Sequence, residues 1–186
     1  DLSISGHAIG DTAYFEPDMK ALIHYKGKRY FLFNILFRGK RGFDSYATGI
    51  KYRGGSKGTW FDAEDGRLEG GSIAHGSVDS AGAIQVKLPP CGSAKIYWWM
   101  AAGKNYIEVQ DLNKLVLKRG PEFFLNRTIS FWKLWVNTSN IEKGDLSPEL
   151  EGLYKRSLLI LRAHTDNRGG IIAAADSDIT SYNGDT

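Results

Sequence analysis

Three acidic residues beside a tryptophan are the first candidates for chemistry. Asp62, Glu64 and Asp65 fall within four positions, and Trp60 precedes them. Carboxylates can accept hydrogen bonds from sugar hydroxyls or supply oxygen ligands to calcium, and an aromatic ring can lie against the apolar face of a sugar. The segment therefore predicts a sugar-contacting loop or a calcium-binding loop, and the simpler alternative is a solvated turn that ends at Gly66.

The tryptophan of this loop has two alternative roles. The neighbours of Trp60 are polar residues and glycines, so its ring could stack on a sugar or could anchor a long loop to the sheet. The other four tryptophans lie in apolar patterns and are expected to pack in the core; they are Trp98, Trp99, Trp132 and Trp135.

Three more acidic residues follow the last apolar run of the chain. Asp176, Asp178 and Asp185 are candidates for substrate binding, and the alternative is that they cap or solvate a loop. The four histidines show no metal spacing and no arrangement for a hydrolytic triad. The lone Cys91 lies in a Pro-Pro-Cys-Gly turn. We therefore expect these histidines and this cysteine to form no hydrolytic triad and to hold no metal, and no pattern indicates a cofactor.

The first hundred residues have the pattern of short strands. Apolar runs at 21–25 and 29–35 flank Lys26-Gly27-Lys28, which predicts a hairpin. Residues 83–88 alternate and predict another strand. Residues 96–100 are apolar on both faces, which predicts a strand buried on both sides.

The pattern changes to helices near Gly103. A first helix is expected over about 106–116 and ends at Gly120-Pro121, and a second follows with Phe124 and Trp132 on one face. Ser147 and Pro148 predict the start of a third helix, because serine caps free amides and proline suits the first helical position. Its apolar residues exceed one face, so we expect it to pack on two sides and to expose apolar surface in this chain.

Composition limits the classes of function. The chain has 186 residues, 42% hydrophobic and 24% charged, with a net charge of +3, values that fit a globular protein and exclude a strongly charged partner such as nucleic acid. No apolar run approaches the length of a membrane helix, so no membrane partner is expected. One cysteine cannot form an internal disulfide, which favours a cytoplasmic location.

Several sequence blocks, always in one order, carry a resemblance to a known family. The C-terminal blocks are Tyr154-Lys155-Arg156-Ser157-Leu158-Leu159-Ile160-Leu161-Arg162, Gly170-Ile171-Ile172-Ala173-Ala174 and Asp176-Ser177-Asp178-Ile179. The upstream blocks are Gly10-Asp11-Thr12-Ala13-Tyr14, Tyr46-Ala47-Thr48-Gly49, Gly58-Thr59-Trp60-Phe61-Asp62-Ala63-Glu64-Asp65-Gly66, Gly76-Ser77-Val78-Asp79-Ser80 and Ala101-Ala102-Gly103-Lys104. Together they resemble the β-domain and the opening of the catalytic domain of prokaryotic glucoamylases, glycoside hydrolase family fifteen.

The resemblance implies an architecture that is mainly β with C-terminal helices. Residues 1–103 would be the later part of a β-supersandwich, 104–147 a helical linker, and 148–186 the first helix and loop of an (α/α)6 toroid. The early strands and most of the toroid would be missing, so we expect a piece of a longer enzyme.

The resemblance also implies a reaction. The family hydrolyses α-glucosidic bonds with inversion, using two carboxyl groups about 6.5–9.5 Å apart. Both catalytic glutamates would lie in the missing toroid, so the chain alone is expected to be inactive. Its partners would be an α-glucan or oligosaccharide and the toroid on which it packs. Two alternatives stay open: a stand-alone carbohydrate-binding or interaction module, and a fragment of a glycoside phosphorylase with the same two-domain plan.

Overall fold

The computed structural model describes residues 11–50, 58–68, 70–138 and 146–171. The chain divides into two compact units, Asp1–Glu122 and Phe123–Thr186. Antiparallel sheets and α-helices make up the described residues, so the fold is β-rich with helices, as the sequence predicts.

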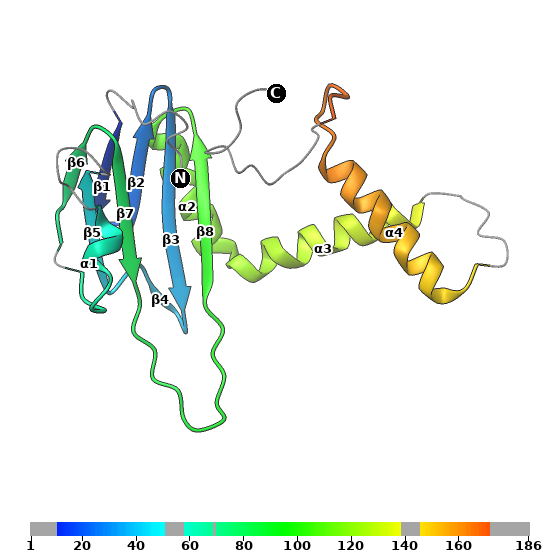
Figure 1. Cartoon of the computed structure of the whole chain (residues 1–186), viewed down its shortest axis with the longest axis horizontal. Coiled ribbons are helices and arrows are strands. Elements are labelled where there is room, and N and C mark those ends of the chain that lie inside the picture. The colour runs from blue at the N-terminus through cyan, green and yellow to red at the C-terminus, as the bar shows by residue number, and fades with distance from the viewer. Residues whose placement is uncertain (1–10, 51–57, 69, 139–145, 172–186) are drawn as a thin grey trace. The chain divides into compact units, whose positions relative to one another are not determined.

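The first unit is built on a six-stranded antiparallel sheet (Figure 1). Its hydrogen-bonded strands follow the order β4 (Lys40–Arg41), β3 (Arg29–Phe37), β2 (Ala21–Lys26), β1 (Thr12–Glu16) and β6 (Ile73–His75). The sixth strand, β8 (Tyr97–Gly103), pairs with β3 on the edge opposite β2. The predicted hairpin is confirmed: Lys26 pairs with Arg29. Gly27 adopts a φ of +57°, in the left-handed region that a tight turn needs.

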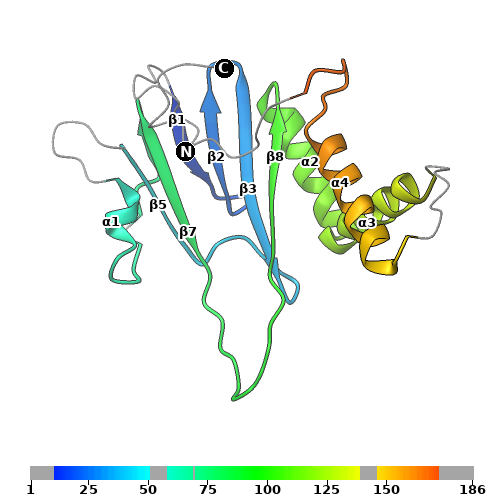
Figure 2. The ribbon, with the colours of Figure 1, turned by 45° about the vertical axis from the view of Figure 1, so that its right-hand side comes forward.

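A second, two-stranded sheet lies against one face of the first (Figure 2). It pairs β5 (Ser45–Ile50) with β7 (Val78–Ala83). Phe15 of β1 stacks on Tyr46 of β5 with ring centroids 3.7 Å apart. His24 Nε2 of β2 lies 2.7 Å from Ser80 Oγ of β7. These two contacts join the layers through one aromatic and one polar pair.

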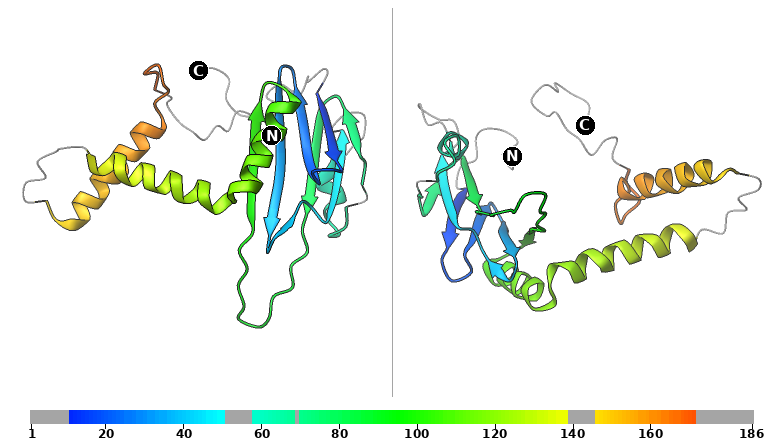
Figure 3. Two further views of the ribbon diagram at one scale, coloured as in Figure 1. Left: turned by 180° about the vertical axis from the view of Figure 1, so that it is seen from behind. Right: turned by 90° about the horizontal axis from the view of Figure 1, so that it is seen from below.

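Helix α2 (Tyr106–Arg119) covers the opposite face of the six-stranded sheet (Figure 3). Asn105 Oδ1 accepts a hydrogen bond from the Glu108 backbone N–H at 2.9 Å and caps the helix start, and Gly120 follows its end. Because the helix covers apolar side chains of β2, β3 and β8, this interface contains the hydrophobic core: Met19, Ala21, Ile23, Leu32, Ala101 and Val109.

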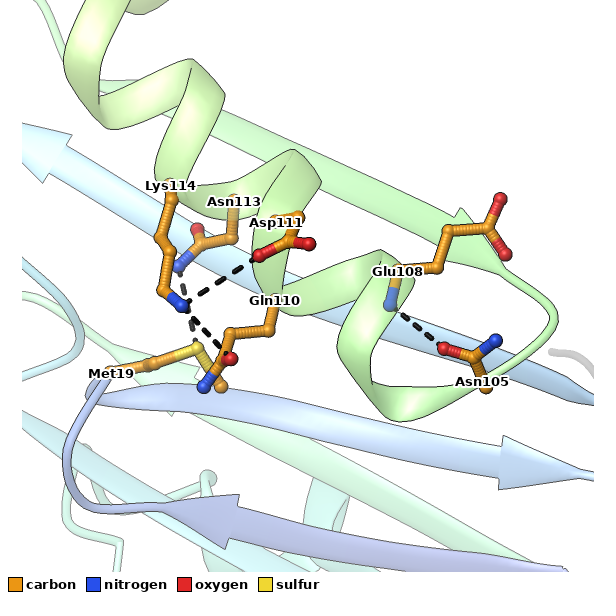
Figure 4. Close-up of polar contacts among 7 residues, drawn as sticks. All are labelled: Met19, Asn105, Glu108, Gln110, Asp111, Asn113 and Lys114. Atoms are coloured by element: carbon orange, nitrogen blue, oxygen red, sulfur yellow. Dashed lines mark hydrogen bonds and ion pairs between the residues drawn. The ribbon is translucent and has the colours of Figure 1, made fainter.

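A buried amide pair lies inside the interface between α2 and the sheet. Asn34 Nδ2 donates to Asn113 Oδ1 at 3.2 Å, and Trp99 Nε1 donates to the same oxygen at 3.1 Å. Asn113 Nδ2 points to Met19 Sδ at 3.7 Å (Figure 4). Both asparagines are fully buried, so each needs these partners to offset the loss of water.

The second unit contains two long helices. Helix α3 spans Pro121–Thr138 and crosses the boundary between the units, and α4 spans Pro148–Ala163. The predicted start of α4 is confirmed, because Ser147 Oγ accepts a hydrogen bond from the Leu150 N–H at 3.4 Å. The exposed apolar surface expected on α4 is also confirmed: none of its residues is buried, and its most exposed apolar residues are Leu150, Leu153, Ile160 and Leu161.

Two expectations about the β-region are wrong. Strand β7 ends at Ala83, and residues 84–96 form an irregular connection in place of the strand predicted over 83–88. Strand β8 is buried on one face only: Ala101 is buried under α2, whereas Trp98 is 60% exposed. The apolar pattern indicated burial on both faces of β8. Helix α2 covers one face, whereas the two-stranded sheet does not cover the other face at Trp98.

No helix among the described residues combines the length and the apolar character that a membrane span requires.

The buried amide pair gives a first prediction. Asn113→Ala removes the acceptor shared by Trp99 and Asn34, and an unsatisfied buried polar group costs about 1–3 kcal/mol. We expect the free energy of unfolding, measured in urea, to fall by at least that amount. Lys114→Ala changes the next, exposed residue of α2 and should have a much smaller effect. Equal losses in both variants would contradict the role of the amide pair.

The contact between His24 and Ser80 gives a second prediction. Burial lowers the pKa of His24, and the negative charges of Asp79 and Asp11 oppose this in part. The folded protein therefore binds the proton less readily than the unfolded chain, whose histidine pKa is about 6.5. The contribution of neutral His24 to the free energy of unfolding is therefore complete above about pH 6.5 and decreases as the pH falls below that value.

His24→Gln should therefore reduce the loss of stability between pH 7.5 and pH 5.5. The measurement is urea unfolding of both proteins at the two pH values. An unchanged pH dependence in His24→Gln would show that this histidine does not contribute.

Candidate functional site

The short helix α1 (Thr59–Asp62) presents two aromatic rings on the surface of the two-stranded sheet. Trp60 is 61% exposed, and Phe61 is also exposed. Their rings are nearly perpendicular, with centroids 5.7 Å apart. The Trp60 side chain is therefore not buried in the core, and the exposed part of its ring is open to a ligand.

A shallow hollow lies beside these rings. It has a volume of about 560 Å³ and is lined by Gly58, Phe61, Asp62, Glu64 and Asp65. The three acidic residues singled out by the sequence therefore line one depression. We call Trp60 and these lining residues the α1 surface.

A second hollow adjoins the first one and shares Asp62 and Gly58 with it. Its volume is about 370 Å³, and its remaining lining comes from β5, from Thr59 and from the Gly70-Gly71 segment. Asp62 thus lines both depressions.

Asp79 of β7 fixes the start of α1. Its Oδ2 accepts a hydrogen bond from the Thr59 backbone N–H at 2.9 Å, and the Thr59 side chain is buried. The carboxylate thus satisfies an amide at the first turn of a helix that is too short to be stable alone. The other oxygen, Oδ1, is buried and has no hydrogen-bond partner among the described residues. Asp79 thus positions the α1 surface from the strand beneath it.

Two glycines make this close approach possible. A Cβ on Gly58 would lie 2.5 Å from Asp79 Oδ2, and Gly58 has a φ of +73° that other residues rarely adopt. A Cβ on Gly49 would lie 3.1 Å from the Thr59 methyl carbon. A Cβ at Gly58 would therefore displace the Asp79 carboxylate that caps α1, and a Cβ at Gly49 would press on the Thr59 methyl group.

The residues after α1 form a polar turn. The Arg67 N–H donates to Asp65 Oδ1 at 2.8 Å, and Gly66 has a φ of +78°. The solvated-turn alternative thus describes the backbone here, while the side chains of Asp62 and Asp65 still line the hollow. Within the described ranges no group of three potential ligands gathers to hold a metal ion, so the calcium-binding alternative has no support.

The remaining candidates cannot be placed in the site. Asp176, Asp178 and Asp185 lie outside the described residues. The sequence analysis missed Asp79, although a charged residue within a strand pattern between Val78 and Ser80 was a usable signal. It also missed the pairing of His24 with Ser80, since the two residues are 56 positions apart.

The sequence matches no family model, and no curated protein is significantly similar to it.

The contact between Asp79 and α1 can be tested by substitution. Asp79→Ala removes a helix-capping acceptor, which costs about 0.5–2 kcal/mol. Asp79→Asn keeps an oxygen that can accept from Thr59 and should retain more stability. Urea unfolding of both variants, followed by circular dichroism, would report the difference between them. Equal behaviour of the two variants would show that capping is not the role of Asp79.

Proposed function

We propose that this chain is the β-domain, helical linker and first toroid helix of a glucoamylase-like inverting glycoside hydrolase, and that its α1 surface contacts the glucan. The observation that carries the sugar contact is the exposed ring of Trp60, whose centroid lies 5.7 Å from that of Phe61, a residue that lines a hollow together with Asp62 and Asp65. The ordered sequence blocks support the family, and a cytoplasmic location accompanies it because the chain has one cysteine.

The chemistry of the α1 surface suits a pyranose. The C–H face of the sugar can lie on the Trp60 ring, and its hydroxyls can donate to the carboxylates of Asp62 and Asp65. Because Asp79 holds α1 against β7, the tryptophan is presented on a supported element. This arrangement binds and orients a glucan, and the proposal leaves protonation of the glycosidic oxygen and activation of water to the two glutamates of the toroid.

The exposed helices favour this enzyme over a stand-alone binding module. Helices α3 and α4 carry many exposed apolar side chains, among them Phe131, Leu134, Leu153 and Leu161. Exposed apolar surface on this scale usually marks an interaction surface. In the proposal, the remainder of an (α/α)6 toroid covers it.

The proposed sugar contact is tested by binding of maltoheptaose, followed by tryptophan fluorescence or calorimetry. Trp60→Ala should weaken binding about tenfold, which corresponds to about 1.4 kcal/mol. Phe131→Ala is the matched control, because Phe131 is similarly exposed, at 57% against 61%, but lies on α3 and does not line the hollow.

Three results distinguish the possibilities. Loss of binding in Trp60→Ala alone supports the α1 surface, and equal binding by all three proteins contradicts it. Glucose release from maltose by the purified chain should be absent, and sustained release after repurification would contradict the assignment of the catalytic step to the toroid.

A further inference from the structure

Strand β8 leaves one edge of the six-stranded sheet open. Its residues Tyr97–Gly103 pair with β3 along one edge. On the other edge no backbone hydrogen bond to β8 occurs among the described residues. Figure 1 shows β8 as the last strand of this sheet. The unpaired N–H and C=O groups of such an edge can pair with another strand.

This edge lacks the features that usually prevent pairing. The sequence of β8, Tyr-Trp-Trp-Met-Ala-Ala-Gly, has no charged residue and no proline. Natural edge strands are commonly protected by lysine, proline, bulges or short length, whereas β8 has seven residues. Trp98 and Met100, on the face away from α2, are 60% and 48% exposed. An incoming strand would therefore gain both backbone hydrogen bonds and apolar contacts.

The order of side chains in β8 points to the partner. Its bulky residues occupy the first half and its small residues the second half. In an antiparallel pair centred on Met100, Trp98 lies opposite Ala102 of the second copy, and Trp99 lies opposite Ala101. Tyr97 lies opposite Gly103 in the same way. Each large side chain thus faces a small one, and no like charges oppose each other.

We propose that two copies of this chain associate through antiparallel pairing of their β8 strands, centred on Met100. A two-fold arrangement uses the same strand on both copies, so one self-complementary segment suffices. The interface continues the sheet and places the exposed Trp98 of each copy against the second copy. The dimer proposal does not depend on the proposed function, because none of the residues of the α1 surface belongs to β8.

The experiment measures mass by light scattering after size exclusion, over a range of concentrations of the full chain. The wild type should be a dimer in the micromolar range. Met100→Lys places two lysines opposite each other and should give a monomer. Met100→Glu should also be monomeric, and an equal mixture of the two variants should recover the dimer because lysine then faces glutamate.

The controls separate pairing from misfolding. Ile107→Lys introduces the same charge at an exposed position of α2 and should remain dimeric. Circular dichroism checks that each variant is folded. If Met100→Lys is unfolded, Ala102→Lys serves as a second variant at another exposed position of β8. A monomeric wild type, or a dimer that persists in the folded lysine variants, overturns the proposal; failure of the mixture to associate overturns the register centred on Met100.

Discussion

The β-rich unit depends on one buried side-chain oxygen, Asn113 Oδ1. It accepts hydrogen bonds from Trp99 of β8 and Asn34 of β3, so a single residue of α2 is joined to two neighbouring strands. Asn34 Nδ2 also donates to the Met19 carbonyl, which joins the β1–β2 turn to the same network. An apolar interface alone tolerates small slips of a helix, whereas a buried amide accepts few geometries without loss of hydrogen bonds. The network therefore fixes the position of α2 on the sheet.

Different contacts hold the face of the six-stranded sheet that lies away from α2. There the two-stranded sheet is joined by the ring pair of Phe15 and Tyr46 and by the contact of His24 with Ser80. Ser80 is adjacent in sequence to Asp79, so the strand that contacts the large sheet also holds α1. Since side chains alternate along a strand, β7 can direct successive residues to its two faces. The position of Trp60 is thus linked to the core by one short strand.

The sequence predicted local elements better than the surroundings of those elements. Gly27 and Ser147 indicated the hairpin and the start of α4 because turns and caps depend on a few neighbouring residues. The burial of Trp98 was predicted wrongly, because apolar character does not reveal whether a second layer reaches a strand. Asp62, Glu64 and Asp65 line one hollow, as close neighbours in the chain can, and their role in binding stays a prediction. Asp79 was missed because its partner, Thr59, is 20 positions away.

Trp60 and Trp98 show why exposure alone does not assign a function. The two side chains are exposed to almost the same extent, 61% and 60%. The ring of Trp60 contacts Phe61, which lines a hollow with carboxylates that can accept hydrogen bonds from hydroxyl groups, so these surroundings suit a polar molecule with one apolar face. Trp98 lies on a strand without charges, 6.0 Å from the ring of Phe33, and beside unpaired backbone groups. Those surroundings suit a polypeptide strand, because the backbone of an extended strand matches a row of alternating donors and acceptors. The neighbours of each ring, and not the ring itself, therefore decide which class of molecule it can bind.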